Sequence, residues 1–320
     1  MKPLLTLFAL PKAFEGETGV RQRAALRSWR SAVPEAQILI MGSEQGLDEA
    51  AREISGERVL EIACNERGTP LVSDAFRTAS AHAKGEILCY INSDILLFDD
   101  FAPAVEVVAR FRGGPFLMTG RRLNFDRETS EPAPTKDQIR RRGLLYDEFN
   151  MDYFVFRRGD FNQLPPFAVG RPGWDNWLVY EARRRGIEVI DATHAVTAGH
   201  LNHDYSHTAE GRAGGKAAVW SGAEAQANRE QAAGRLFDLS DATHVIGSSL
   251  RVQKRRDPWH WWRRRSVAHE VYPQVRWILH PLSLFEGCIR RVDHGVRLFL
   301  LRRGIDLFPH KEKRSAGSLS

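Results

Sequence analysis

An apolar segment that runs into a short acidic turn lies at residues 85–95, which read Gly85-Glu86-Ile87-Leu88-Cys89-Tyr90-Ile91-Asn92-Ser93-Asp94-Ile95. The apolar run between the glycine and the polar turn predicts a strand that is buried on both faces of a parallel sheet. Ligands of open α/β sheets bind beyond the carboxyl ends of such strands. A carboxylate at this place can hold Mg²⁺ or Mn²⁺, because both ions accept oxygen ligands and can bridge the protein to two phosphates. Asp94 is therefore the first candidate for a metal ligand.

Strand and helix signals alternate on both sides of this segment. In the first part of the chain, we expect strands at 4–10, 37–41, 59–62, 87–91 and 116–119 and helices at 19–31, 44–54, 72–83 and 99–112. After an exposed loop with one short helix at 126–142, we expect strands at 152–156, 187–190 and 195–197 and helices at 174–185 and 223–236. This order is typical of βαβ units and predicts an α/β fold with a Rossmann-like, mostly parallel sheet flanked by helices.

The chain has 320 residues, of which 42% are apolar, so it can bury one large core and has room for an appendage. We expect a main α/β domain at 1–207, an Ala/Gly-rich connecting segment at 208–250 and a basic, Trp-rich helical tail at 251–320. The three cysteines lie far apart, which favours a reducing compartment over a disulfide framework. No apolar run approaches the roughly 18 residues of a membrane span, and the first apolar run lacks a cleavage site, so we expect a cytoplasmic protein.

The positive charge is concentrated in the last part of the chain. Residues 251–314 hold sixteen Lys or Arg and six Asp or Glu, together with four of the eight tryptophans. A helix of this composition could lie on an anionic membrane surface, which would place the protein peripherally on the inner face of the membrane. It could equally be a helical appendage that packs on the main domain. Nucleic acid is not an expected partner, because no recognised binding module accompanies the charge.

The chain resembles the glycosyltransferase-A fold and, within it, the family 2-like glycosyltransferases, which are nucleotide-diphospho-sugar transferases. The resemblance covers about residues 4–205 and rests on Asn65-Glu66-Arg67-Gly68, a helix that contains Asp74, and the segment from Ala83 to Asp94. In that family an Asp-x-Asp turn follows the fourth strand, and its last Asp coordinates the metal on a nucleoside-diphosphate sugar. The resemblance implies that Asp94 is this metal ligand in a DXD-like turn. Asn92 replaces the first Asp, and its amide would contact the ribose. Ser93, between these two positions, is also expected to bind the donor.

The resemblance also implies a catalytic base. Asp175 lies 81 residues after Asp94, at the start of an expected helix, where the family often places an acidic residue that receives the proton of the acceptor hydroxyl in an inverting reaction. The alternative is that Asp175 only caps this helix beside two core tryptophans, since Asp is favoured near helix N-termini.

The densest histidine cluster of the chain is His200-Leu201-Asn202-His203-Asp204-Tyr205-Ser206-His207. Imidazole binds Mn²⁺ and Zn²⁺ well. Several enzymes of the family supply a metal-binding histidine shortly after the helix with the base, which implies His200, with His203 as the alternative. The cluster could also be a polar loop of hydrogen-bonding residues, and a separate zinc site would lack a convincing fourth ligand.

Four further positions correspond to donor contacts of the family. Ala9 and Pro11, followed by Lys12, come after the first strand, where the family holds the nucleobase, and Arg67 and Asp74 lie where base or sugar contacts occur. Arg67 and Asp74 could instead form a surface ion pair.

Two segments beyond the acidic turn carry weaker signals. Arg121 and Arg122 could clamp phosphate oxygens or be structural. The segment Asp152-Tyr153-Phe154 is given no catalytic role.

These features predict a metal-dependent, inverting glycosyltransferase. It would use Mn²⁺ or Mg²⁺ and a nucleoside-diphosphate sugar, with a UDP-sugar preferred. The acceptor would be the hydroxyl of a glycan or of a lipid-linked molecule in the synthesis of cell-surface glycans or glycolipids. The alternative is a non-catalytic nucleotide-sugar-binding or membrane-docked scaffold protein of the same fold, because the turn at Asn92 lacks one carboxylate. A sugar-1-phosphate nucleotidyltransferase is disfavoured, because its Gly-rich loop does not follow the first strand.

Overall fold

The computed structural model describes residues 5–111, 114–126, 131–202 and 221–256, together with the single residues Trp277 and Pro281. The chain divides into two compact units, Met1–His260 and Trp261–Ser320. All elements below belong to the first unit. His203, the alternative to His200 as a metal ligand, and nearly all of the basic tail lie outside the described residues.

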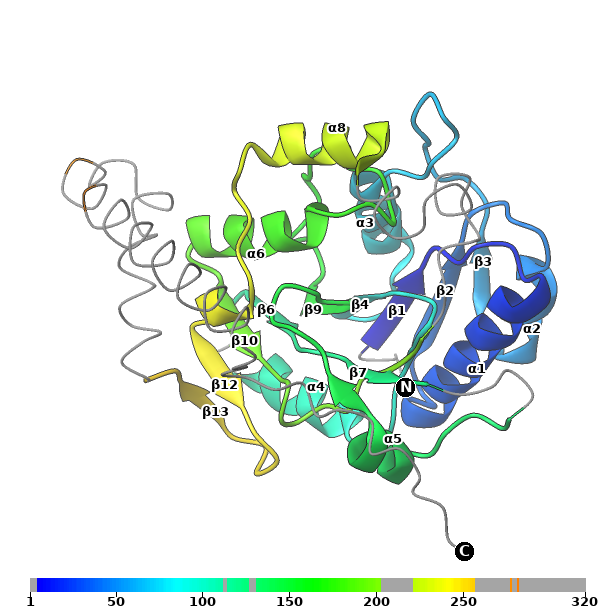
Figure 1. Cartoon of the computed structure of the whole chain (residues 1–320), viewed down its shortest axis with the longest axis horizontal. Coiled ribbons are helices and arrows are strands. Elements are labelled where there is room, and N and C mark those ends of the chain that lie inside the picture. Colours follow the sequence, from blue (N-terminus) through cyan, green and yellow to red (C-terminus); the bar gives the residue numbers. More distant parts are fainter. Residues whose placement is uncertain are drawn as a thin grey trace, which may run out of the picture. The chain divides into compact units, whose positions relative to one another are not determined.

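A nine-stranded sheet forms the centre of the first unit, with the strand order β13-β12-β10-β6-β9-β4-β1-β2-β3 (Figure 1). Its strands are β1 (Leu5–Ala9), β2 (Gln37–Met41), β3 (Glu57–Val59), β4 (Ile87–Ile91), β6 (Phe116–Thr119), β9 (Tyr153–Arg157), β10 (Glu188–Asp191), β12 (His244–Ile246) and β13 (Val252–Lys254). The pairs β1–β2, β2–β3, β1–β4, β6–β10 and β10–β12 are parallel. The predicted α/β fold with a mostly parallel sheet is therefore confirmed.

Two strands of this sheet run against the others. β9 is antiparallel to both β4 and β6, and Tyr153 at its beginning pairs with Ile91 at the end of β4. Because β9 is reversed, its amino end lies at the edge where the parallel strands have their carboxyl ends. The second reversed strand, β13, pairs with β12. It begins the segment for which the sequence predicts a helix, so at least 252–254 of that segment are extended.

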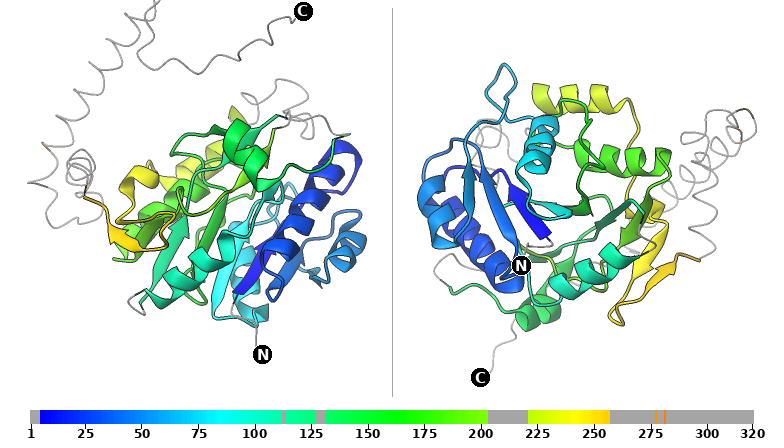
Figure 2. Two further views of the ribbon diagram at one scale, coloured as in Figure 1. Left: turned by 90° about the horizontal axis from the view of Figure 1, so that it is seen from below. Right: turned by 180° about the vertical axis from the view of Figure 1, so that it is seen from behind.

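Helices lie on both faces of the sheet, with α3, α6 and α8 on one face and α1, α2 and α4 on the other (Figures 1 and 2). The helices are α1 (Gly16–Ala32), α2 (Leu47–Glu53), α3 (Val72–His82), α4 (Phe101–Arg110), α5 (Lys136–Arg142), α6 (Trp174–Arg184) and α8 (Ala223–Ala232), with a 3-10 turn at Leu239–Asp241. Within the part of the chain that the structure describes, no helix combines the length and the apolar character needed to cross a bilayer.

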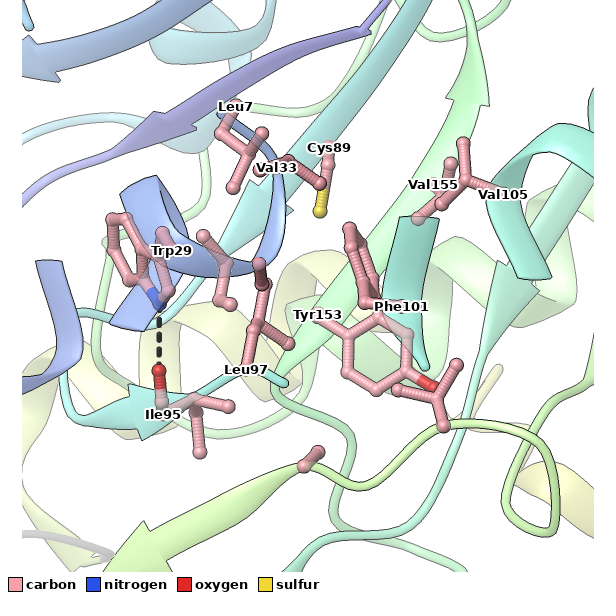
Figure 3. Packing of buried hydrophobic residues seen from close by; sticks show 14 of the residues in the cluster. Leu7, Trp29, Val33, Cys89, Ile95, Leu97, Phe101, Val105, Tyr153 and Val155 are labelled. Carbon is pink, nitrogen blue, oxygen red and sulfur yellow. Dashed lines mark hydrogen bonds between the residues drawn. The ribbon is translucent and has the colours of Figure 1, made fainter. Parts of the chain in front are cut away.

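Alternate residues of the buried strands supply two cores. On the face covered by α1 and α4, Leu7 and Cys89 pack with Trp29 and Phe101 (Figure 3). On the other face, Phe8 belongs to a cluster of aromatic rings that extends to α3 and α6. Because the central strands are apolar on both faces, the sheet is fixed between the two helix layers.

A second, four-stranded sheet has the order β5-β11-β7-β8. Its strands are β5 (Ile95–Leu96), β7 (Leu123–Phe125), β8 (Leu144–Leu145) and β11 (Gly199–Leu201). The strand predicted at 195–197 is wrong, because these residues form a loop and the strand begins only at Gly199. Ala195 and Val196 are buried in the core, and their apolar side chains give the same sequence signal as a short buried strand.

Candidate functional site

The acidic turn follows β4 directly and is held in place by its neighbours. The backbone N–H of Asn92 donates to the carbonyl of Asp152 (2.9 Å), and the Asn92 side-chain amide donates to the Asp152 carboxylate (2.8 Å). Tyr90, on β4, donates its phenol hydrogen to Oδ1 of Asn92 (3.0 Å). Both ends of the Asn92 side-chain amide therefore form hydrogen bonds within the protein, whereas 28% of the Asp94 side chain is exposed to solvent.

His200 lies beside Asp94, with 3.5 Å between His200 Nε2 and Asp94 Oδ2. Strand pairing explains this proximity: β5 begins at Ile95, directly after Asp94, and Ile95 is the antiparallel partner of His200 on β11. His200 is 7% exposed, and its Nδ1 lies 3.3 Å from Oδ1 of Asn202. The second ring nitrogen thus has its own partner, which orients the imidazole with Nε2 toward the carboxylate.

An ion pair with little solvent exposure adjoins the turn through Asp152. Nη1 of Arg122 donates to both oxygens of Asp152 at 2.9 Å, and the guanidinium lies over the ring of Tyr146. Burial opposes the charge of Arg122, but the carboxylates of Asp152 and Asp94 outweigh it and raise the pKa of the guanidinium. Arg122 is therefore a permanent positive charge near Asp94.

Asp175 lies in the first turn of α6. Gly173, before this helix, has a φ of 105°, a left-handed conformation that glycine adopts readily, and its N–H donates to Oδ1 of Asp175 at 3.3 Å. The residue keeps partial contact with solvent, but protein atoms enclose the carboxyl group. Burial and, to a smaller extent, the Asp152 carboxylate raise the pKa of Asp175 to about 7, against the lowering effect of hydrogen bonds from backbone N–H groups.

The three carboxylates form one electrostatic cluster. Burial and the negative charges of Asp94, Asp152 and Asp175 together raise the pKa of the Tyr90 phenol. The ring of Tyr90 also packs edge-on against Trp174, the residue before Asp175, with 4.9 Å between the centroids. Residues that are far apart in the sequence thus meet at the carboxyl edge of β4, the edge at which ligands of open α/β sheets bind.

The four predicted donor contacts stay predictions, and the structure shows the surroundings of Ala9, Pro11 and Asp74. Ala9 is fully buried in the core, and Pro11 is also buried, so their side chains are not available at the surface. Asp74 accepts a hydrogen bond from the backbone of Ala63 (2.7 Å) and forms an ion pair with Arg77. Asp74 thus has a different partner from the Arg67 considered in the sequence analysis.

Two residues that the sequence analysis did not select belong to the site. Asp152 connects Asn92 to Arg122, as described above. Gln22 of α1, which is 2% exposed, accepts a hydrogen bond from the Ser93 hydroxyl at 2.9 Å. In the sequence, Gln22 is visible only as a polar residue on the buried face of a helix. Many polar residues have such a position without belonging to a functional site.

The carboxylate of Asp94 and the imidazole of His200 fit a divalent cation. Two ligand atoms at about 2.1 Å from one ion are about 3.0–3.5 Å apart for angles between 90° and 110°, and the Asp94–His200 separation is 3.5 Å. Among the described residues, no three His, Cys, Asp or Glu side chains gather in a metal-binding group. A cation here would thus take its other ligands from water or from substrate phosphates, which is usual for Mg²⁺.

No protein-family model matches the chain, and no curated protein sequence matches it. Among solved structures, the chain is similar to a mannosyltransferase from Pyrobaculum calidifontis in complex with GDP-Man and Mn²⁺, with 17% identity and a TM-score of 0.41, over 63% of this chain and 57% of the other. It is also similar to glucosyl-3-phosphoglycerate synthase from Mycobacterium tuberculosis, with 16% identity and a TM-score of 0.44, over 76% and 84% of the two chains. A complex of that synthase with Mn²⁺, UDP-glucose and phosphoglyceric acid matches with 14% identity and a TM-score of 0.43, over 79% and 86%.

These matched proteins are of the class that the sequence motifs resemble. The identities and TM-scores are low, so the assignment of the α/β fold rests on the strand order and pairing described above.

Proposed function

We propose that this protein is a glycosyltransferase that transfers a sugar from a nucleoside-diphosphate sugar to an acceptor hydroxyl with the help of Mn²⁺ or Mg²⁺. The observation that carries the proposal is the pair formed by Asp94 and His200, whose ligand atoms are 3.5 Å apart at the carboxyl edge of β4. Asp94 belongs to the same electrostatic cluster as Asp175, a carboxyl group whose pKa is about 7.

Four residues of the site, Asp94, His200, Arg122 and Asp175, have distinct tasks in the proposed reaction. Asp94 and His200 would hold the divalent ion, which neutralises the charge that grows on the diphosphate leaving group. Arg122 adds a fixed positive charge near Asp94. Asp175 would receive the proton of the acceptor hydroxyl, because a pKa near neutrality suits a group that must take up a proton at physiological pH. A base in this role corresponds to an inverting displacement.

The nature of the two substrates follows from the sequence resemblance. A UDP-sugar is the preferred donor, and the mannosyltransferase and synthase found by comparison bind GDP-Man and UDP-glucose, respectively. The acceptor would be a glycan or a lipid-linked molecule. In the latter case the basic segment 251–314 would hold the protein at an anionic membrane surface.

Thermal stabilisation by nucleotide sugars tests the donor site. A ligand at 100 times its Kd adds about 2.7 kcal/mol of stability, which raises the melting temperature measurably. We expect one class of nucleotide sugar to stabilise the protein only with Mn²⁺ or Mg²⁺. Asp94→Asn and His200→Ala should lose this metal-dependent part. Asp99→Asn is the matched control, because Asp99 is exposed and pairs with Lys136. The donor site would be wrong if Asp94→Asn were stabilised as strongly as the wild type.

Release of free nucleoside diphosphate distinguishes an enzyme from a binding protein. A glycosyltransferase hydrolyses its donor slowly when no acceptor is present, whereas a pure binder does not. We expect slow, Mn²⁺-dependent release from the donor found in the stability screen. Binding without any release, with or without candidate acceptors, would favour the scaffold alternative.

A further inference from the structure

The loop after β1 is tied to the acidic turn by a single buried amide. Oε1 of Gln22 accepts hydrogen bonds from the backbone N–H of Lys12 (2.8 Å) and from the hydroxyl of Ser93 (2.9 Å). Its Nε2 donates to the carbonyl of Lys12 at 2.9 Å. Both functional groups of this amide are therefore used, and they fix the backbone of Lys12 next to the residue that precedes Asp94.

The ammonium group of Lys12 lies among charges of both signs. Asp94 attracts it, whereas Arg171 and Arg21 repel it. Arg171 is itself held by a salt bridge with Glu224, with 2.7 Å between Nη2 and Oε2. Lys12 as a whole is exposed to solvent, but protein atoms surround its ammonium, and this loss of water lowers the pKa of Lys12 to about 8. Asp94 is thus the charge that favours the ammonium in this place.

We propose that Lys12 is the internal counter-ion of Asp94 before a divalent cation binds, and that it turns to the phosphates of a nucleoside diphosphate once the cation has taken its place. The proposal rests on the cation site proposed at Asp94. It adds a coupling between three partners: the cation and the ammonium compete for one carboxylate, and the displaced ammonium, on a backbone that Gln22 holds still, becomes available to an anion.

The competition between the ammonium and the cation predicts the direction in which metal binding and nucleotide binding change. Two positive groups close to one carboxylate repel each other, so the ammonium weakens the binding of a divalent cation in the absence of nucleotide. When phosphates are present, the ammonium gains a charged partner, and its contribution to nucleotide binding becomes favourable. Removal of this one charge should therefore strengthen the binding of the metal alone and weaken the binding of the nucleotide with the metal.

The test uses the full chain with Mn²⁺ alone and then with UDP in the presence of saturating Mn²⁺. Free Mn²⁺ is measured by electron paramagnetic resonance, and UDP binding by calorimetry. Lys12→Met keeps most of the apolar stem and removes the charge. We expect its Kd for Mn²⁺ to fall about two- to fivefold, the scale of a partly exposed ion pair. We expect its Kd for UDP to rise about tenfold, the scale of one hydrogen bond to a charged group.

Two further variants make the result specific. Lys12→Arg keeps the positive charge and should stay within about twofold of the wild type for both ligands. Lys84→Met removes an exposed lysine that pairs with Glu57 and precedes β4, whereas the acidic turn follows the other end of this strand, and it should change neither Kd. An unchanged or higher Kd for Mn²⁺ in Lys12→Met would overturn the counter-ion role while the cation site remained. Absence of Mn²⁺ binding in both wild type and variant would remove the cation site and this proposal together.

Discussion

Replacement of Asp175 by asparagine should make the protein more stable at alkaline pH. Burial raises the pKa of Asp175 from 3.8 to about 7. Between these two pH values the folded protein keeps a proton that the unfolded chain has released, so the free energy of unfolding of the wild type falls as the pH rises through this window and is constant above it. Asparagine cannot ionise, and its side-chain oxygen can still accept the hydrogen bond from the N–H of Gly173.

The size of the effect follows from the shift. One pKa unit corresponds to about 1.4 kcal/mol, so a shift of about three units gives an upper limit of about 4 kcal/mol. Asp175 is partly exposed, and solvent screening reduces this limit. We therefore expect the stability of Asp175→Asn relative to the wild type to be about 2 kcal/mol higher at pH 8 than at pH 4.5.

Urea unfolding followed by circular dichroism measures this difference without any substrate. Asp137→Asn is the matched control: Asp137 lies on the exposed side of α5, with 74% of its side chain accessible, and its variant should follow the wild type at both pH values. The reasoning would be refuted if Asp175→Asn gained the same stability at pH 4.5 as at pH 8, because the carboxyl group would then titrate as it does in water.

Three further perturbations test other parts of the site. If Asp175 is the base, the initial rate of sugar transfer should rise with pH through about 7 and then level off, and Asp175→Asn should lose about 10²- to 10⁴-fold; a flat profile would assign the proton transfer elsewhere. Asp152→Asn leaves the buried charge of Arg122 without its carboxylate and should cost about 2–4 kcal/mol in urea unfolding, whereas a loss below about 0.5 kcal/mol would mean that water already screens the pair. Trp29→Phe removes the hydrogen bond from the indole N–H to the carbonyl of Ile95 (2.7 Å) and should cost about 2–3 kcal/mol; unchanged stability would contradict the packing seen in Figure 3.

The sequence predicts the central part of the fold well because the signal there is local. β4 has the predicted bounds, 87–91, since an apolar run between a glycine and a polar turn marks both ends of a buried strand. The pairing partner of a strand is not a local property. Nothing in the segment that begins at Tyr153 indicates that β9 runs against β4 and β6, because an apolar strand buried on both faces has the same pattern in either direction.

The difference between local sequence signals and non-local strand pairing also applies to the site. Asp94 follows a strand with a strong pattern, and its position at the sheet edge could be predicted. The proximity of His200 depends on β5 and β11, strands of two and three residues that are too short to produce a period in the sequence. The sequence does not indicate a role for Asp152, and its place opposite Asn92 follows from the reversed direction of β9.

The groups around the acidic turn therefore come from different elements: from the parallel strand β4, from helix α6, from the reversed strand β9, and from the small sheet through β11. The first two elements leave a pattern in the sequence. The other two are held by backbone pairing, as between Ile95 and His200, and by side chains such as Gln22 that bridge two loops. A substitution that weakens this pairing should separate the ligands without touching either of them, because the geometry of the site is a property of the strands on which its residues lie.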